Sequence, residues 1–431
     1  MRVTEKNYKL MGWLVCSLAA LYYCYEYLLR VTPSVMEEPL RAHFNLSAAG
    51  FGFLSAFYYY AYVPLQVPVG VLLDRYGPRL LLTAACLICV IGSFLLASTS
   101  VFWVAAMGRF CVGFGSAFAF VGVLKLATIW LPEDRLAMVA GMASALGTLG
   151  AMLGDNVMGF FVDHIGWRQT VNWSAYIGIL LTVSLWFGIH DRKKYQRHSG
   201  TVSSFRKSMI DLLIIARNKQ TWINGLIGCL SYLPTTVFAE LWGIPYLEHA
   251  HGLSHQSAGF ANSLIFLGFM LGAPLMGFIS DHIKRRKPPM LFGTMGACLV
   301  MITVLYMPGL TAFNLDVLLF FLGVFYSAQC IVFAVGRELS PTEAGGTAMA
   351  IVNMIVMLGA MLLQPFVGHL LDFSLKMHEP VRLLQHLSVD TLHQLYTPID
   401  YQFALSVVPI GILSAAILTF FLKETYADTT N

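Results

Sequence analysis

The sequence predicts an all-α membrane protein whose twelve transmembrane helices form two six-helix bundles related by pseudo-symmetry. Hydrophobic residues make up 57% of the 431 residues and charged residues only 12%, whereas a soluble domain carries about 25% charged residues. The mean hydropathy is +0.68. A chain of this composition has too little polar surface to face water on all sides. A succession of long apolar stretches and an internal repeat are the other two observations behind this prediction.

Each predicted span is a run of mostly apolar residues that is long enough to cross a bilayer. A helix needs roughly 20 such residues for the crossing, and its backbone polar groups must be paired within the segment. Twelve stretches meet this requirement: 12–35, 47–72, 80–99, 101–128, 137–161, 169–190, 221–245, 256–279, 289–308, 315–336, 345–371 and 401–422.

The basic residues outside these stretches indicate which side faces the cytoplasm. Twenty Lys and Arg residues fall on the side of the N-terminus, and four fall on the other side: Arg41, Arg168, Lys376 and Arg382. Cytoplasmic segments carry an excess of Lys and Arg. We therefore expect a multi-pass protein of the cell (inner) membrane, in contact with the lipid bilayer, with both termini in the cytoplasm.

An internal repeat divides the spans into two sets of six. The spacing G-x3-D-x4-R occurs twice, 207 residues apart: Gly70, Asp74 and Arg79, then Gly277, Asp281 and Arg286. LGAMLGDNVMGFFVD (149–163) also matches LGAMLLQPFVGHLLD (358–372), with an offset of 209. The repeat predicts an N-terminal bundle, 1–190, and a C-terminal bundle, 221–431. The basic polar stretch between them, 191–220, is expected to be a cytoplasmic linker.

Several stretches resemble the major facilitator superfamily. GVLLDRYGPR (70–79) is similar to the family's loop motif between spans two and three, and GFISDHIKRRK (277–287) to its weaker copy between spans eight and nine. GRFCVGFGSA (108–117) resembles the family's fourth-span signature, an Arg followed by closely spaced glycines. The resemblance implies the major facilitator fold, and parallel repeats of this kind place the substrate site between the halves near the midplane.

A finer resemblance concerns one branch of that superfamily. YYCYEYLLRVTPSVM (22–36) and LWGIPYL (241–247) look like the branch that holds the lysosomal dipeptide transporter and the phagosomal amino-acid transporters of intracellular bacteria. This resemblance implies an amino acid or a short peptide as the substrate.

The loop motifs are the predicted gate. Gly70 permits close helix contact, and Asp74 can accept hydrogen bonds from a neighbouring helix end and pair with Arg75 or Arg79. Such charges would hold the cytoplasmic side shut until the pairs break. The second copy supplies the same groups: Gly277, Asp281 and Arg286. The alternative is a tight loop that only follows the cytoplasmic excess of basic residues.

Charged residues inside spans cost at least ~2.5–3.5 kcal/mol at the bilayer centre and mark functional sites. Glu26 and Arg30 lie one helical turn apart and share a face. At about 1.5 Å per residue, Glu26 and Arg109 lie at nearly the same depth, so they could meet. Glu26 is the leading candidate for a proton-coupling carboxylate, with Arg109 adjusting its proton affinity. A static ion pair that braces two helices is the alternative.

Asp155 and Glu240 are further proton-coupling candidates. Exporters of the superfamily carry G-x3-G-P-x2-G-G in the fifth span, and here Asp155 replaces the Pro and Met158 a Gly. This departure disfavours drug export. Glu240 lies in the outer part of the seventh span and is expected to face either the cavity or its rim. Lys125, at the inner end of its span, is expected to reach the membrane interface.

Polar and aromatic side chains inside spans are the candidate substrate ligands. Hydroxyls on several faces of the first two spans, and amides elsewhere, suit the carboxylate and amide groups of a substrate. The candidates are Tyr23, Tyr27, Arg30, Tyr59, Gln66, Asn156, Asn353 and Gln364. An interfacial aromatic belt and hydrogen bonds between helices are the alternatives.

Histidines gather in the predicted extracytoplasmic loops: His249, His251, His255, His378, His386 and His393. We expect solvated loop residues. The alternatives are a sensor of acid pH and a metal site that includes Glu248.

These observations predict a monomeric secondary active transporter, not an enzyme. The sequence contains no phosphate-binding G-x4-G-K-[ST] loop, nucleophile elbow or nucleic-acid footprint, so no cofactor, metal or nucleic-acid partner is expected. The expected activity is proton-coupled import, by alternating access, of a small polar organic solute such as an amino acid or short peptide. An exporter of a drug or siderophore is the first alternative. A transporter-like membrane sensor or assembly partner is the second.

Overall fold

The computed structural model describes residues 5–132, 135–190, 212–341, 344–378 and 396–426. Within these ranges the regular elements are all helical, and no β-strand occurs. Ten helices are long and apolar enough to cross a membrane, or eleven if one bent pair counts as a span. The prediction of an all-α membrane protein is therefore confirmed. The predicted stretch 221–245 is not one of the ten, because it is divided among shorter elements.

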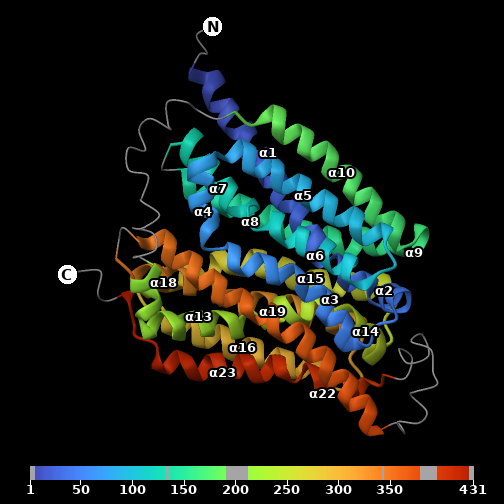
Figure 1. The fold of residues 1–431 in the computed structure, drawn as a ribbon. Helices are drawn as coiled ribbons and strands as arrows, with labels where there is room; N and C mark the ends of the chain where they lie inside the picture. Colours follow the sequence, from blue (N-terminus) through green and yellow to red (C-terminus); the bar gives the residue numbers. More distant parts are fainter. Residues whose placement is uncertain (1–4, 133–134, 191–211, 342–343, 379–395, 427–431) are drawn as a thin grey trace.

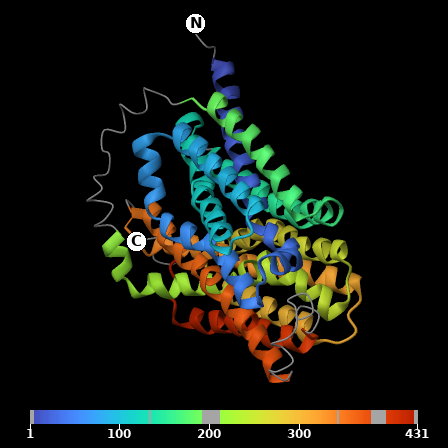
Figure 2. The same cartoon turned by 45° about the vertical axis from the view of Figure 1, so that its right-hand side comes forward.

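The helices form two groups, which lie largely one above the other in both views (Figures 1 and 2), and α3 (Ala48–Leu65) of the first group packs on α19 (Gly345–His378) of the second. The first group contains α1 (Glu5–Val31), η1 (Thr32–Met36), α2 (Glu37–Phe44), α3 (Ala48–Leu65), α4 (Pro68–Tyr76), α5 (Pro78–Ser98), α6 (Phe102–Ser116), α7 (Ala119–Trp130), α8 (Leu136–Leu153), η3 (Gly154–Met158), α9 (Gly159–Ile165) and α10 (Trp167–Gly188).

The second group follows residues 191–211 in the sequence. It contains α13 (Lys219–Ser231), η4 (Pro234–Trp242), α14 (Gly243–His251), α15 (His255–His282), α16 (Lys287–Tyr306), α17 (Ala312–Tyr326), η5 (Ser327–Cys330), α18 (Ile331–Glu338), α19 (Gly345–His378), α22 (Pro398–Leu405) and α23 (Val407–Phe421). The predicted boundaries of the two bundles and of the linker remain a proposal.

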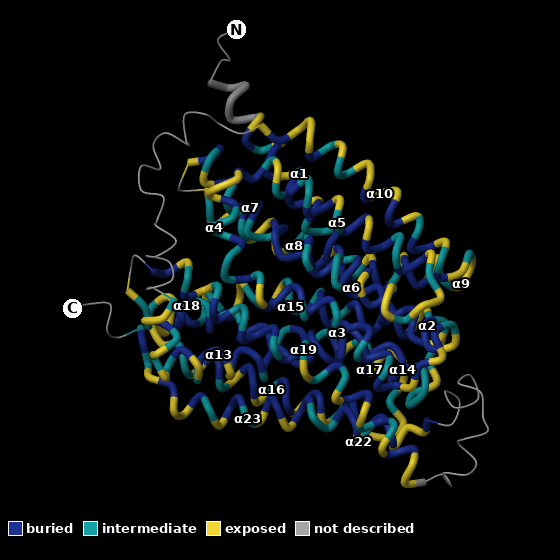
Figure 3. Tube along the Cα trace, viewed as in Figure 1, coloured by how far each residue is buried: buried dark blue, intermediate teal, exposed yellow. Residues whose placement is uncertain are grey.

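Large apolar side chains are exposed along the periphery of both groups. Leu180 on α10, Phe292 on α16 and Phe420 on α23 are all more than 60% exposed, and exposed positions recur along the outer helices in Figure 3. A soluble domain rarely exposes so large an apolar surface to water. The exposed belt is the surface that lipid covers.

The turns between helices lie at two opposite ends of the molecule. We call the end with the turns at Gly77 and Ile283 the terminal end, and the end with the turns at Gly166 and Gly252 the far end. In Figure 1 the two groups approach each other towards α2, α9 and α14, at the far end, and diverge towards α4, α7 and α18, at the terminal end.

Glycines report the same difference at atomic scale. A Cβ added to Gly52 or Gly259, towards the far end, would lie 2.6 or 2.7 Å from a carbonyl oxygen of the other group. At the terminal end, no neighbouring atom of the described residues lies within 4 Å of the corresponding position at Gly70 or Gly277. The far end is therefore closed and the terminal end open.

The second predicted span, 47–72, is broken rather than continuous. Helices α3 and α4 meet at Gln66–Val67 with a bend of 67°. Pro64 and Pro68 flank this break, and proline both lacks an N–H donor and clashes with the preceding turn of a helix. The bend separates α4, which carries the first loop motif, from the direction of α3.

Candidate functional site

Arg30, near the C-terminal end of α1, lies at the centre of a buried charge cluster between the two groups. Its Nη2 donates to Glu26 Oε1 at 2.7 Å, and its Nε donates to the Tyr58 hydroxyl at 2.9 Å. Its Nη1 lies 3.9 Å from Oε1 of Glu240, which belongs to the second group. The side chains of Arg30, Glu26 and Glu240 are at most 2% exposed.

Aromatic rings surround the Arg30 guanidinium. Its central carbon lies 4.3 Å from the ring centre of Tyr27, 4.9 Å from that of Tyr62 and 5.4 Å from that of Tyr58. A cation over the face of such a ring is attracted by its quadrupole, and the attraction grows when water is excluded. The sequence anticipated tyrosines here, but it did not rank Tyr58 or Tyr62 as ligands. Their spacing of four residues, which places them on one face of α3, is the signal that could have found them.

Glu240 extends the cluster into the second group. It lies on η4, a π-helical segment, and π-bulges inside helices occur frequently at functional sites. The Tyr59 hydroxyl donates to Glu240 Oε2, while Oε1 has no hydrogen-bond partner among the described residues. Of the two positions predicted for Glu240, the structure shows the interior one.

Arg109 does not meet Glu26, so this expectation is wrong. Its Nη1 donates to the Leu29 carbonyl at 3.0 Å and its Nη2 to the Arg30 carbonyl at 3.4 Å. These carbonyls belong to the last turn of α1, where helical C=O groups lack intrahelical partners and the helix dipole favours a cation. Depth along the membrane placed Arg109 near α1, but depth alone does not give the direction of the side chain.

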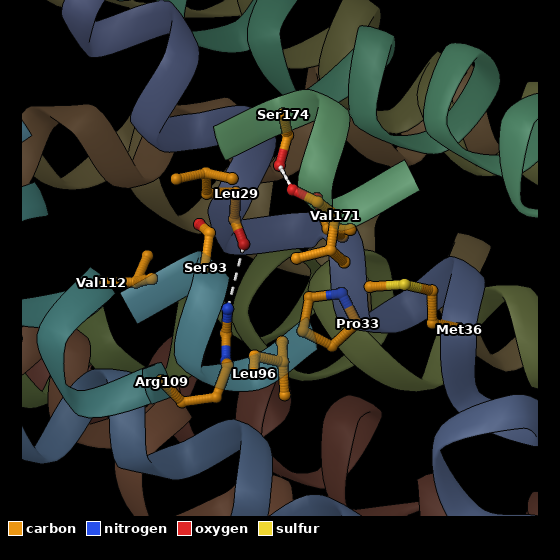
Figure 4. A pocket seen from close by; sticks show the side chains of 10 residues that line it. Leu29, Pro33, Met36, Ser93, Leu96, Arg109, Val112, Val171 and Ser174 are labelled. Carbon is orange, nitrogen blue, oxygen red and sulfur yellow. Dashed lines mark hydrogen bonds between the residues drawn. The ribbon is translucent and has the colours of Figure 1, made fainter. Parts of the chain in front are cut away.

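Arg109 also lines a small pocket inside the first group. Figure 4 shows the guanidinium beside the Leu29 carbonyl, with Pro33, Ser93 and Val171 around it. The Arg109 side chain is buried, and its Nε has no hydrogen-bond partner among the described residues. Arg109 thus fixes the end of α1, one turn beyond Glu26.

Asp155 lies apart from the Arg30 cluster, towards the far end. It is on η3, the second π-helical segment, at the position where exporters of the superfamily would carry a proline. Asn262 of the second group donates to its Oδ2 at 2.7 Å, and Ser34 donates to its Oδ1 at 3.5 Å. Asp155 therefore joins the two groups through neutral partners. The sequence did not indicate Asn262, because no motif around it distinguishes it from a buried amide in any other helix.

The remaining candidate ligands lie at four separate places. Tyr27 contacts Tyr232 of the second group, with 3.2 Å between hydroxyls, and its ring packs edge-on against Tyr23. Asn353 donates to Gln66 at 2.8 Å, which joins the groups beside the α3–α4 break. Tyr27, Gln66 and Asn353 thus form contacts between the two groups.

Gln364 and Asn156 bond to backbone instead. The Gln364 side chain donates to the Thr236 carbonyl at 2.7 Å and that of Asn156 to the Met152 carbonyl at 2.9 Å. The Met152 carbonyl lies one turn before Asn156 along the same span. The Asn156 side chain therefore donates to backbone at the point where the π-helical segment begins. The alternative stated for the amides, hydrogen bonds between helices, describes Gln364, whereas the bond of Asn156 stays within its own helical segment.

The first loop motif has different partners from those expected. Asp74 forms an ion pair of 2.5 Å with Lys125 on α7, and not with Arg75 or Arg79. Arg79 donates to the Trp186 carbonyl at 2.9 Å and stacks on that indole, while Arg75 lies over the Tyr76 ring. Gly70 makes no close helix contact in this conformation. Lys125 was expected to reach the membrane interface. Its side chain is partly exposed and pairs with Asp74.

The second motif copy is more tightly bonded. Arg286 donates to Asp281 at 2.7 Å and to Glu338 on α18 at 2.6 Å. Like Gly70, Gly277 has no neighbour within 4 Å in the described residues. Among the described residues, the ion pairs of Asp74 and of Arg286 each stay within one group of helices.

Of the predicted histidines, His249, His251 and His255 lie on α14 and at the start of α15, at the far end. The described residues contain no group of three His, Cys, Asp or Glu side chains that could hold a metal ion. His386, His393 and the side chain of His378 lie outside the described residues.

Two groups of membrane-spanning helices that meet around buried charges define a multi-pass membrane transporter. Comparison with known families makes the class specific. The chain belongs to the Major Facilitator Superfamily, whose family model matches residues 15–364. Proteins of this family are transporters and not enzymes, so both predictions are confirmed.

Individual relatives are distant. The chain is 24% identical to the probable galactarate/D-glucarate transporter GudP of Bacillus subtilis, over 84% of this chain and 86% of the relative. It is 25% identical to the lysosomal dipeptide transporter MFSD1 of Danio rerio, over 81% of this chain and 77% of the relative. The crystal structure of a bacterial homolog of the human lysosomal transporter Spinster, in an inward-facing and occupied conformation, matches the fold with a TM-score of 0.76 at 17% identity, covering 95% of this chain and 96% of that one.

Proposed function

We propose that this protein imports a small carboxylate-bearing solute together with protons, and that an amino acid or short peptide is the leading substrate class. The observation that supports this most is the position of Arg30, which lies between Glu26 of the first group and Glu240 of the second. A guanidinium is suited to bind a carboxylate in bidentate fashion. Two of the relatives are a lysosomal dipeptide transporter and a probable galactarate/D-glucarate transporter, and dipeptides and sugar diacids both carry carboxylates.

The signs of the charges favour a zwitterion over a diacid. Arg30 offers a cation to a substrate carboxylate, and Glu26, which stays ionised, offers an anion to a substrate ammonium group. A sugar diacid brings two anions and no cation to this site, and unpaired buried charge is costly. Sugar acids, which the name of the Bacillus relative favours, are the second candidate class.

Proton coupling follows from which contacts change when the two groups move. Glu26 and Arg30 lie one turn apart on α1, so their ion pair persists in every conformation. The contact between Arg30 and Glu240 crosses between groups and is broken or remade during alternating access. We therefore propose Glu240 as the principal proton-coupling residue, with Glu26 as the fixed counter-ion of Arg30, whereas the sequence favoured Glu26.

A substrate carboxylate that binds Arg30 would compete with Glu240 for the Nη1 atom of Arg30. Glu240 would then remain buried without its cation. Protonation removes that charge, so substrate and proton enter the site together. Oε1 of Glu240, which has no hydrogen-bond partner among the described residues, is the atom that receives the proton in this proposal.

The orientation is proposed from the basic residues. The terminal end carries Arg75, Arg79 and the run Lys284–Lys287, and the stretch 191–220 adds eight more. By the positive-inside rule the terminal end faces the cytoplasm, both termini are cytoplasmic, and the far end is extracytoplasmic. We propose a monomer in the inner membrane. The exporter alternative is disfavoured by Asp155 in the fifth span, and the sensor alternative by the charge cluster between the groups.

Uptake into proteoliposomes tests the proposal, with L-alanine, dialanine and D-glucarate as labelled probes. We expect a zwitterion to accumulate under an inward proton gradient. Glu240→Gln should lose accumulation but retain exchange of labelled for unlabelled substrate, because exchange needs no net proton movement. Asp316→Asn, which removes an acidic group on α17 outside the cluster, is the matched control and should behave like wild type.

Three results would contradict parts of this proposal. Gradient-driven accumulation by Glu240→Gln with normal pH dependence would return Glu26 and Asp155 to first place. Uptake of D-glucarate alone would select the second substrate class. Absence of both uptake and exchange for all carboxylate probes, with folded protein, would favour the sensor alternative.

A further inference from the structure

The far end closes through two contacts that the internal repeat relates to each other. In one, α3 packs against α19, and in the other α15 packs against η3 and α9. Helices α3 and α15 begin in the same way, with Ser47 and Ser254 as N-caps, 207 residues apart. Each cap follows a residue of left-handed conformation, Asn45 or Gly252, two positions before it.

The close approaches are also equivalent. A Cβ on Gly52 would lie 2.6 Å from the Gln364 carbonyl oxygen, and one on Gly259 would lie 2.7 Å from that of Asp155. The two glycines are 207 residues apart and the two carbonyls 209, which are the offsets of the repeat. The backbone arrangement is therefore the same in both contacts, and the two contacts differ in their side chains.

At the α3–α19 contact, a carboxylate binds the helix terminus directly. Asp372 of α19 accepts hydrogen bonds from the backbone N–H of Ala48 and of Ala49, at 3.0 Å each. Ala48 is fully buried, and its carbonyl lies against Gly368. An anion at a helix N-terminus is stabilised by the free N–H groups and by the helix dipole. None of the donors in this contact titrates near neutral pH.

At the α15 contact, an imidazole replaces the backbone donors. His255 occupies the repeat position of Ala48, and Asp163 that of Asp372. Oδ1 of Asp163 lies 3.9 Å from Nε2 of His255, and Nδ1 of His255 lies 2.6 Å from Oε1 of Glu248. The ring lies near Gly159, the counterpart of Gly368. The histidine thus stands between a carboxylate of each group.

The protonation state of the ring decides whether this contact is favourable. A neutral imidazole has one N–H donor, and a donor on Nδ1 that serves Glu248 leaves a lone pair on Nε2 facing Asp163. Nε2 indeed has no hydrogen-bond partner among the described residues. A protonated imidazole donates from both nitrogens and carries a positive charge between two anions. The charge of Glu38 on α2 acts on the ring in the same sense.

We infer that His255, between Asp163 on α9 and Glu248 on α14, is a proton-binding site of the far-end gate, and that the bound proton favours the closed gate. Opening the far end removes Asp163 from His255, so the open gate binds the proton less strongly. By linkage, acid on that side shifts the equilibrium towards closure. This site is separate from the Arg30 cluster. The assignment of the acid side to the exterior rests on the orientation in the proposed function.

Distance measurements on the full-length protein in nanodiscs, without substrate, test this inference. Spin labels at Ser100 and Met307, exposed far-end positions on the two groups, report the open and closed populations. We expect the ratio of closed to open gates to rise about tenfold between pH 7.5 and pH 5.5, the change that one charge-assisted contact can provide. His255→Ala, which installs the residue of the first contact, should remove most of this rise. Asp163→Asn should do the same from the other group.

Control variants separate this site from other titrating groups. His251→Ala should leave the pH response intact, because the hydrogen-bond partners of His251 among the described residues, Tyr246 and the Val304 carbonyl, belong to its own group. Glu240→Gln removes the carboxylate proposed for proton coupling, and the part of the response that His255→Ala removes should persist in it. A normal pH response in both His255→Ala and Asp163→Asn, or its loss in Glu240→Gln alone, would overturn the inference. Because no substrate is present, the result is independent of which solute is transported.

Discussion

At the far end the two groups of helices contact each other at backbone distance, whereas at the terminal end the conspicuous charges bind partners within their own group. Gly52 and Gly259 leave no room for a Cβ against the other group. Asp74 and Arg286, by contrast, pair with Lys125 and Glu338 of the same group. In the part of the chain that the structure describes, the ion pairs of Asp74 and Arg286 therefore do not bridge the two groups in this conformation. If the loop motif holds the terminal end shut, these residues must exchange partners to do so.

The two motif copies also differ in how firmly they are bonded. The side chains of Asp74 and Lys125 are 54% and 28% exposed, whereas those of Arg286 and Glu338 are 11% and 15% exposed. Exposed ion pairs contribute little to stability, typically about 0–1 kcal/mol. The first copy is thus the one whose partner can be exchanged at small cost, and the second is a fixed part of its group.

Filling the far-end contact should have the largest effect. Gly52→Val places a branched side chain where even a Cβ would be 2.6 Å from the Gln364 carbonyl, so the far end cannot close. We expect uptake to fall by about a hundredfold or more, since an enzyme or transporter step slowed by about 2.7 kcal/mol loses two orders of magnitude. Initial uptake rates at matched protein amounts measure this effect.

Gly70→Val is the matched variant at the terminal end. Its added atoms meet open space here, so the protein should fold normally and favour the conformation of this structure. If Gly52→Val transported normally, the close contact at the far end would not be essential to the transport cycle.

The sequence predicted the class of fold well, because both of its signals are physical requirements of the whole chain. Long apolar stretches follow from the thickness of the bilayer, and the repeat follows from two bundles that solve the same packing problem. It did not predict the bend at Gln66–Val67, although Pro64 and Pro68 were visible, because prolines in membrane helices are often accommodated without a break.

Side-chain partners were predicted less well than positions. Glu26, Arg30 and Glu240 were recognised because charges inside spans are rare and costly, and the structure brings these three together. Arg109 was predicted to lie near Glu26, but it binds carbonyl groups at the end of α1 instead. The depth of a residue in the membrane does not show how its helix is rotated about its axis, so it does not give the direction of the side chain. The pair of Asp74 and Lys125 joins residues 51 positions apart, and no local spacing rule predicts such a contact.

Loss of the first motif carboxylate should have an intermediate effect. Asp74→Asn keeps the size of the side chain and removes its charge, so the conformation that is shut at the terminal end should lose a charged contact. We expect uptake to slow by about tenfold, which corresponds to about 1.4 kcal/mol. Lys125→Ala should slow it less, because the exposed pair of Asp74 and Lys125 contributes little to the stability of the conformation described here. An equal effect of the two variants would instead indicate that Asp74 acts solely through Lys125.

The second motif carboxylate should have the smallest effect. Asp281 is 65% exposed, and Arg286 retains its bonds to Glu338 when Asp281 is replaced. Asp281→Asn should therefore change uptake by no more than about twofold and leave the melting temperature almost unaltered, as for other exposed pairs. Glu338→Gln should lower the melting temperature more, because it weakens the less exposed Arg286 pair and the bond from the Thr425 hydroxyl. Uptake rates together with thermal unfolding of each variant separate these outcomes. Should Asp281→Asn slow uptake as strongly as Asp74→Asn, the two copies would act as equivalent gates, and their different bonding in this conformation would have no bearing on transport.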